Sequence, residues 1–275
     1  MPLTPYACGN CGFWQRYFEP PPDCPVCTDV RNDLPEDGWS WLAAKDAEAC
    51  HEGELREVAP GFYQPTTTPG LGLAGSGWLT VREGGNVAFE AAPYYSGAML
   101  ARIEALGGIA ILGASHVHGY GALWQLQDRF APDALAIQVG DLQLTKAFRV
   151  SLPYEDGFDL GRGFTLHHVG GHYEGQAALH DADARRLFCG DMFKIDQDEE
   201  GRAVAISTHK AFHKNIPMTH AELRRYRAAL EPLDFTSVCT PFEHAPDVGR
   251  ELCLAVLDRA LSEPPSVTHY PVSEL

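Results

Sequence analysis

The chain has 275 residues, with 21 Lys and Arg against 37 Asp and Glu, which gives a formal net charge of −16 at pH 7. Apolar residues make up 45% of the chain and aromatic residues 10%, a composition that excludes wholesale disorder. The acidic balance argues against nucleic-acid binding, which needs clustered Lys and Arg. No stretch approaches the roughly 18 uncharged apolar residues that span a bilayer.

The N-terminal residues include neither a basic segment nor an apolar one of the kind that directs export. We therefore expect a cytoplasmic protein whose partner is a small-molecule substrate, and neither a nucleic acid nor a membrane. Nothing in the sequence favours one oligomeric state over another.

Four of the cysteines form two C-x-x-C pairs near the N-terminus, Cys8 with Cys11 and Cys24 with Cys27. Each such turn brings two thiolates to one ion, and the second pair completes a tetrahedral shell of four sulfurs. Because four protein ligands leave no open position, we expect a structural Zn²⁺. The alternatives are unrelated surface thiols or a redox dithiol, and two matched pairs favour the metal.

The rest of the chain mixes predicted strands and helices, which indicates an α/β domain over residues 36–275 behind a zinc-ribbon-like segment of residues 1–35. Residues 28–38 are polar and predict a linker. The apolar alternation and turn residues predict strands at residues 78–82, 87–89 and 109–112. Composition and capping signals predict helices at residues 39–57, 96–106, 219–230 and 247–261.

Histidine and aspartate residues follow several short apolar runs, at the strand ends where α/β folds collect ligands. The first run leads into an H-x-H motif, and later runs lead into G-G-H, G-D and E-H sequences. These candidate ligands are His116, His118, His172, Asp191 and His244. Imidazole and carboxylate together suit Zn, Fe or Mn better than Ca or Mg. The remaining histidines are expected to be surface or core residues, although His209 and His213 flank a loop-like stretch that could approach the site.

The order of these motifs resembles the metallo-β-lactamase-fold superfamily, over roughly residues 60–275. In its N-terminal C-x-x-C pairs and its altered H-x-H loop, the chain resembles an uncharacterised branch of this superfamily. The resemblance implies an αββα sandwich with a metal site at one edge of its two sheets. It also implies that His116, His118 and His172 form a three-imidazole set, with Asp191 as a bridging carboxylate and His244 as a second-site imidazole.

The loop after His118 departs from the H-x-H-x-D-H pattern of most members, because Tyr120 and Gly121 stand where Asp and His are usual. The second ion would keep only two protein ligands, so we expect a mononuclear site, or one tight and one weak site. The usual base is lost as well. Asp191 and Tyr120 are the catalytic candidates, although a phenol with a pKa of about 10 is a poor base.

The leading hypothesis is a metal-dependent hydrolase of a small ester, thioester or lactone, in which Zn or Fe at the His/Asp site activates a metal-bound water. The first alternative is a non-haem Fe(II) oxygenase that uses His116, His172 and Asp191 as a 2-His-1-carboxylate set. The second is a non-catalytic metal-binding protein. The substrate is not written in any motif, because variable loops shape the pocket of such folds.

Overall fold

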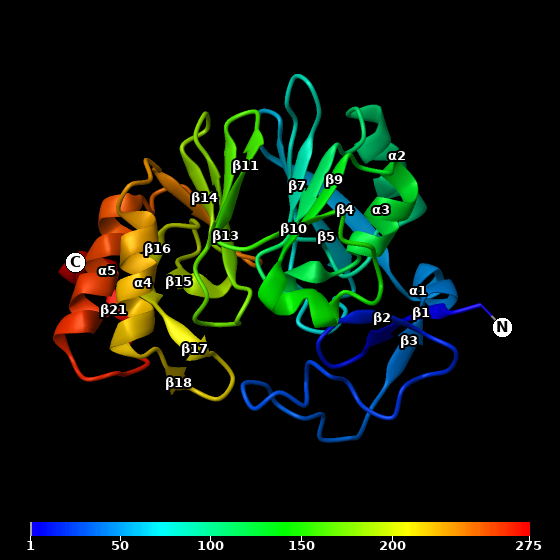
Figure 1. The fold of residues 1–275 in the computed structure, drawn as a ribbon, viewed down its shortest axis with the longest axis horizontal. Helices are drawn as coiled ribbons and strands as arrows, with labels where there is room; N and C mark the ends of the chain where they lie inside the picture. Colours follow the sequence, from blue (N-terminus) through cyan, green and yellow to red (C-terminus); the bar gives the residue numbers. More distant parts are fainter. Residues whose placement is uncertain (1) are drawn as a thin grey trace. The chain divides into compact units, whose positions relative to one another are not determined.

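The computed structural model describes residues 2–275, and the chain divides into two compact units, Met1–Tyr154 and Glu155–Leu275. Both units combine β-sheets with α-helices (Figure 1). None of the helices within the described part of the chain is long and apolar enough to cross a membrane.

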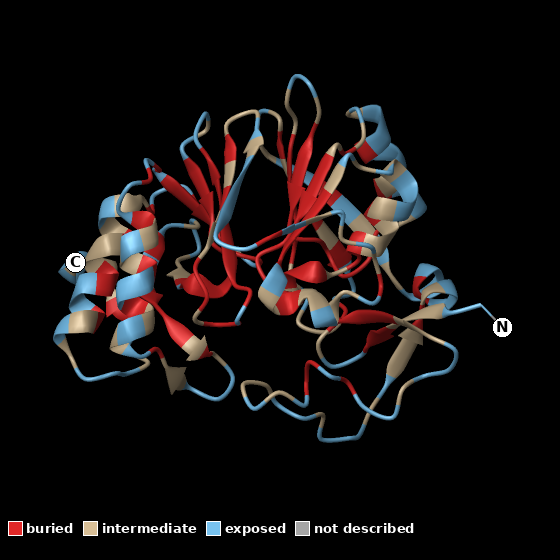
Figure 2. Ribbon diagram, in the orientation of Figure 1, coloured by how far each residue is buried: buried red, intermediate tan, exposed pale blue. Residues whose placement is uncertain are grey.

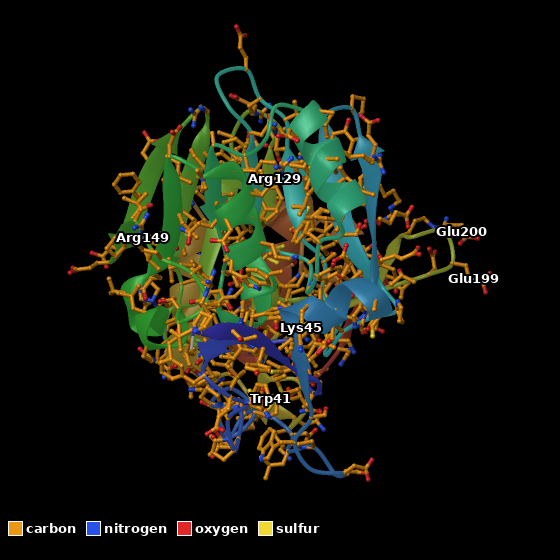
Figure 3. The ribbon with its side chains drawn as sticks, turned by 90° about the vertical axis from the view of Figure 1, so that its right-hand side faces the viewer. Trp41, Lys45, Arg129, Arg149, Glu199 and Glu200 are labelled. Atoms are coloured by element: carbon orange, nitrogen blue, oxygen red, sulfur yellow. The ribbon has the colours of Figure 1, made fainter. Side chains whose placement is uncertain are left out.

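The N-terminal segment forms a three-stranded antiparallel sheet in the order β2 (Trp14–Tyr17), β1 (Thr4–Cys8), β3 (Trp41–Ala43). Its third strand therefore comes from beyond residue 35. Figure 3 labels Trp41 in this strand and Lys45 in the short helix α1 (Ala44–Cys50) that follows it.

The helix predicted over residues 39–57 is wrong, because β3, α1 and the strand β4 (Glu52–Ala59) occupy that stretch. Backbone hydrogen bonding to the neighbouring strand β5 (Phe62–Thr68) overrides the acidic, Ala-rich composition of these residues. Only Leu55 of β4 is buried, so the strand carries little of the apolar alternation by which strands are recognised.

The first unit is built on a seven-stranded sheet in the order β10-β9-β8-β7-β6-β5-β4. Strands β7 to β10 run parallel to one another, and β4 to β7 pair antiparallel. The strands not yet placed are β6 (Trp78–Thr80), β7 (Val87–Phe89), β8 (Ile111–Gly113), β9 (Ala134–Gln138) and β10 (Leu152–Tyr154). The strands predicted near residues 78, 87 and 109 are thus confirmed.

Two helices, α2 (Gly97–Ala105) and α3 (Leu123–Phe130), cover one face of this sheet (Figure 1). The side chain of Ser96 accepts a hydrogen bond from the backbone N–H of Met99 and so caps α2, as its sequence predicts. Figure 2 shows the strands of the sheet largely buried and the outward faces of the two helices exposed.

The second unit is built on a six-stranded sheet in the order β11-β12-β13-β14-β19-β20. Its strands are β11 (Gly157–Gly161), β12 (Phe164–His168), β13 (Ala177–Asp181), β14 (Arg186–Phe188), β19 (Ser237–Cys239) and β20 (His244–Ala245). The helices α4 (His220–Leu230) and α5 (Arg250–Ser262) pack together and enclose an apolar core with the sheet. The capping box predicted at Thr219 and Glu222 is confirmed at the start of α4.

Two small sheets complete the second unit. One contains β15 (Lys194–Gln197), β16 (Ala203–Ser207) and β21 (Tyr270–Pro271), and the other pairs β17 (His209–Ala211) with β18 (Ile216–Pro217). The side chains of Glu199 and Glu200 point outward from the turn between β15 and β16 (Figure 3).

Candidate functional site

The four N-terminal cysteines lie together, with their sulfur atoms all within 4.8 Å of one another. The Sγ atoms of Cys8 and Cys27 are 3.8 Å apart, and those of Cys11 and Cys24 are 3.7 Å apart. Zn–S bonds of about 2.3 Å in a tetrahedron set each S···S edge at about 3.8 Å. The cysteines form no disulfide, and their arrangement fits one tetrahedrally bound metal ion.

Backbone turns and a neighbouring loop fix the two C-x-x-C knuckles in the first unit. The N–H of Gly12 donates to the carbonyl of Cys8 at 2.8 Å, and the N–H of Thr28 donates to that of Cys24 at 3.0 Å. The loop after β5 packs against the first knuckle so closely that a Cβ on Gly72 would lie 2.0 Å from the nitrogen of Gly12. The cluster therefore supports part of the domain as well as its own segment.

The H-x-H motif follows β8 in the first unit and continues into a short 3₁₀ turn, Val117–Tyr120. The rings of His116 and His118 have centroids 5.3 Å apart and planes at 79°. His116 is fully buried, and the hydroxyl of Ser115 lies 2.8 Å from its Nδ1. This contact fixes the ring orientation, as polar partners do for metal-binding histidines.

A buried carboxylate, Glu90, supports this turn from the end of β7. It accepts hydrogen bonds from the backbone N–H of Ser115 at 3.2 and 3.3 Å and is 1% exposed. Its Oε2 lies 1.5 Å from where a Cβ on Gly119 would stand, so any larger residue at that position would displace the Glu90 carboxylate. Sequence reasoning missed Glu90, because its only local signal is an acid directly after a short apolar strand.

The second knuckle lies within electrostatic range of the H-x-H turn. The pKa of Asp29 lies below its usual value, chiefly because the guanidinium of Arg31 hydrogen-bonds it, and the charge of His118 acts in the same direction. Two N–H groups of Arg31 reach the carboxylate at 2.7 Å. The four-cysteine segment and the imidazole pair therefore belong to one locality of the first unit.

The positions that depart from the superfamily pattern lie in the interior of the first unit. Tyr120 is 1% exposed and has its ring edge against Phe148. Burial raises its pKa well above the usual value, and Asp141 adds to the effect. A catalytic role for this phenol stays a prediction, and its surroundings favour a packing role.

The backbone geometry at position 121 explains why glycine rather than histidine stands there. Its φ is +39°, and a Cβ there would lie 2.2 Å from the carbonyl oxygen of Ala91. A side chain at this position would collide with backbone atoms, which cannot move aside as a flexible side chain can. The close approach of the H-x-H turn to the segment after β7 thus requires glycine.

In the second unit, His172 follows two glycines with positive φ, Gly170 at +62° and Gly171 at +89°. A Cβ on Gly171 would lie 2.6 Å from the Cε of Met218 and 2.7 Å from the hydroxyl of Tyr226. That hydroxyl accepts a hydrogen bond from the backbone N–H of His172 at 3.2 Å. Helix α4, which carries Tyr226, therefore positions the G-G-H loop.

Asp191 lies in a 3₁₀ turn, Gly190–Met192, just after β14, and is 7% exposed. Its Oδ2 is 3.4 Å from the Nε2 of His172, which is 3% exposed. Two ligands bonded to one Zn²⁺ at about 2.1 Å lie about 3.4 Å apart in a tetrahedron. The two side chains are therefore spaced as ligands of one ion.

His244 begins β20, where its backbone carbonyl accepts a hydrogen bond from the Nε2 of Gln197 at 3.0 Å. Among residues 2–275, the grouped candidate ligand atoms include those of His172 and Asp191 but not those of His244. A ligand role for His244 stays a prediction.

The carboxyl group of Glu243, next to His244, lies near Asp191, and sequence reasoning gave it no role. Burial raises the pKa of Glu243, and the charge of Asp191 raises it further, whereas a hydrogen bond from Thr240 lowers it.

His209 is the buried histidine of β17, with 3% of its surface exposed. Its ring stacks on Phe212 at a centroid distance of 4.9 Å, and Phe212 in turn contacts His172 at 5.5 Å. Burial lowers the pKa of His209 to about 4, with further contributions from His269 and Lys194, so the ring is neutral at pH 7. His213, at the other end of this short segment, is exposed.

No protein-family model matches the chain. The uncharacterized protein YmaE of Bacillus subtilis (strain 168) is 24% identical to it over 249 residues, which cover 86% of this chain and 88% of YmaE.

Several solved structures share the fold. A crystal structure of the DIM-1 metallo-β-lactamase superposes with a TM-score of 0.55 at 11% identity, over 76% of this chain and 98% of that one. The mono-zinc form of the metallo-β-lactamase FIM-1 from Pseudomonas aeruginosa gives 0.53 at 11% identity, over 77% and 97% of the two chains. A metallo-β-lactamase from Hirschia baltica gives 0.52 at 16% identity, over 78% and 99%. The predicted fold is thus confirmed, and this chain is a metallo-β-lactamase-fold protein with an N-terminal four-cysteine cluster.

Proposed function

We propose that the protein is a metal-dependent hydrolase of a small ester, thioester or lactone. In this proposal its metal ligands are His116, His118, His172 and Asp191. The observation that carries the proposal is the spacing of His172 and Asp191, whose ligand atoms lie 3.4 Å apart and are both buried. The paired rings of His116 and His118 add two imidazoles from the motif that metal sites of this fold use.

The donor set of three imidazoles and one carboxylate suits Zn²⁺ or Fe²⁺. When bound, Zn²⁺ would supply Lewis-acid chemistry, lowering the pKa of a water ligand toward about 7 and polarising a substrate carbonyl. FIM-1, which shares the fold, has been crystallised in a mono-zinc form, and this supports a single-ion site as a workable arrangement.

The residues around the ligands have defined roles in this proposal. Ser115 orients the ring of His116, and Glu90 anchors the turn on which both imidazoles stand. Tyr226 anchors the backbone of His172. The carboxylate of Asp191, beside His172, would also accept a hydrogen bond from the attacking nucleophile.

A single tight ion follows from the ligand count in this proposal. Tyr120 is buried and Gly121 leaves no room for a side chain, so the H-x-H turn offers no further donor. His244 does not group with His172 and Asp191. A second ion would depend mostly on water for its ligands.

The test combines metal analysis with a panel of esters, thioesters and lactones. We expect the purified protein to contain the thiolate-bound Zn and one further Zn. Asp191→Asn and His172→Ala should each lose that further ion and lower kcat/KM at least about 100-fold. The matched control is His213→Ala, at an exposed histidine.

Two results would overturn the proposal. The first is Asp191→Asn protein that is folded and keeps both its metal content and its kcat/KM. The second is iron in place of zinc, together with oxygen consumption in the presence of thiols, which would establish the oxygenase alternative.

A further inference from the structure

A second pair of imidazoles lies in the second unit and is not part of the ligand set proposed above. His209 is 3% exposed, and neither of its ring nitrogens has a hydrogen-bond partner among the described residues. Burying a polar group without a partner is costly, and native proteins rarely leave one so. The ring therefore requires a partner that is not one of the protein's own side chains.

His269, which precedes β21, provides a second nitrogen beside it. The centroids of the His209 and His269 rings are 5.4 Å apart and their planes meet at 88°. His116 and His118, the paired imidazoles of the proposed site, have almost the same arrangement, at 5.3 Å and 79°. Two rings in this relation can direct one nitrogen each at a shared ion.

The other side of the His269 ring is fixed by a carboxylate. Its Nδ1 lies 2.6 Å from the Oδ2 of Asp196 on β15. A carboxylate that hydrogen-bonds one ring nitrogen orients the ring and raises the basicity of the other nitrogen, as it does behind many metal-binding histidines. The Nε2 of His269 is thereby left as the donor.

We propose that His209 and His269 bind a divalent transition-metal ion through one imidazole nitrogen each, with Asp196 positioning His269. Because the protein supplies only two ligands, water completes the shell and the ion exchanges readily. Phe212 stacks on His209 and also contacts His172, so this site neighbours the proposed hydrolytic one without sharing a ligand.

The charges around the pair set its metal preference. The Nζ of Lys194 lies 3.6 Å from Asp196 and balances its charge. The ion would therefore meet two imidazole nitrogens and no surplus of negative charge. Imidazole ligands of this kind suit Zn²⁺, Ni²⁺ and Cu²⁺, whereas Mg²⁺ and Ca²⁺ require oxygen ligands.

The experiment uses the full-length protein with His116→Ala, His172→Ala and Asp191→Asn, which keeps only one of the four proposed hydrolytic ligands. This parent protein is titrated with Ni²⁺ or Zn²⁺ alone. Calorimetry should show that the parent protein binds one exchangeable ion. This binding should be lost when His209→Phe or His269→Phe is added to the parent, and it should be retained when His213→Phe is added. Asp196→Asn should weaken this affinity about 10- to 100-fold without changing the number of ions. Mg²⁺ should give no binding.

Nitrogen hyperfine splitting in the electron paramagnetic resonance spectrum of bound Cu²⁺ should show two imidazole ligands in the parent protein, and this signal should be missing from either histidine variant. If His209→Phe does not fold, His209→Gln takes its place. The proposal fails if the folded His209 variants bind as many ions as the parent with equal affinity. It also fails if His269→Phe leaves binding unchanged, because a single imidazole would then account for the site.

Discussion

The four-cysteine cluster and the imidazole turn of the first unit are both metal-ligand sets, but they are built in different ways. The cysteine ligands lie in two short knuckles whose turns are closed by backbone hydrogen bonds a few residues apart. The imidazoles of His116 and His118 depend instead on Glu90, which is distant in sequence. The cluster is thus specified locally, whereas the imidazole turn is specified by tertiary packing.

This difference predicts different responses to mutation. Loss of one thiolate should release the ion and unfold the local knuckles, since the metal provides much of their stability. Loss of a support beneath the imidazole turn should leave the fold intact and misplace the ligands.

The largest effect is expected from Cys27→Ser. Structural Zn²⁺ binding contributes about 10–16 kcal/mol to the folding of small zinc-dependent peptides. Loss of the ion should therefore lower the melting temperature of the first unit by more than about 10 °C or make the protein insoluble. Thiol-bound zinc released by a mercurial reagent, together with a thermal melt, measures both changes. Cys50→Ser is the control, because Cys50 is exposed and outside the cluster. Equal stability of the two variants would contradict a structural metal.

The next largest effect is expected from Glu90→Ala. The variant leaves the buried N–H of Ser115 without its acceptor, which costs about 3 kcal/mol. Denaturant unfolding measures the stability, and metal titration should show weaker binding at the His116 and His118 pair. Glu83→Ala removes an exposed carboxylate before β7 and should change neither quantity. A Glu90 variant with unaltered metal affinity would mean that the turn holds its shape unaided.

A smaller loss is expected from Gly121→Ala, which tests why the H-x-H loop is altered. The positive φ and the contact with the Ala91 carbonyl should together cost about 1–3 kcal/mol in the free energy of unfolding. Gly38→Ala separates the two causes, because Gly38 also has a positive φ, +82°, but nothing within 4 Å of its Cβ position. If both variants lose the same stability, steric exclusion is not the reason for glycine at position 121.

The smallest effect concerns pH and the support of His172. Burial raises the pKa of Glu222 at the start of α4, but hydrogen bonds from Lys210 and Thr219 outweigh burial and lower this pKa below its usual value. A carboxyl group with a lowered folded-state pKa stabilises the fold above its unfolded pKa of about 4.3, and that stability is lost as the pH falls through the folded value.

Wild-type protein should therefore lose more stability than Glu222→Gln between pH 6 and pH 3. Unfolding at a series of pH values measures this difference, and Glu231→Gln at the exposed end of α4 serves as control. If the stability of wild type and Glu222→Gln changed with pH in the same way, the Glu222 cap would not contribute to the stability of α4, the helix that carries Tyr226.

The parts of the site that could be predicted from the sequence are those that are specified locally. The four cysteines and the H-x-H pair could be predicted because their ligands stand in contiguous motifs. The order of motifs along the chain was also sufficient to predict the fold. Ligand supports were missed where the contact joins distant residues: Ser115 and Glu90 are 25 residues apart, and His172 and Tyr226 are 54 apart.

The missed strand β4 has a related cause. Its residues gain their hydrogen bonds from β5, and their own side chains carry mostly charge rather than an apolar alternation. At position 121 the sequence shows directly that histidine is absent. The steric cause, the carbonyl of Ala91, is visible only in the structure.

The two edge strands of the seven-stranded sheet affect how readily copies of the protein aggregate in a concentrated solution. At one end, β4 exposes Glu52, Glu54, Arg56 and Glu57 along its length. At the other end, β10 is three residues long and has Pro153 at its centre. An incoming strand would meet clustered charge at the first edge and a residue without an N–H at the second. The sheet therefore resists growing by edge-to-edge aggregation, and the net charge of −16 adds a general repulsion between copies.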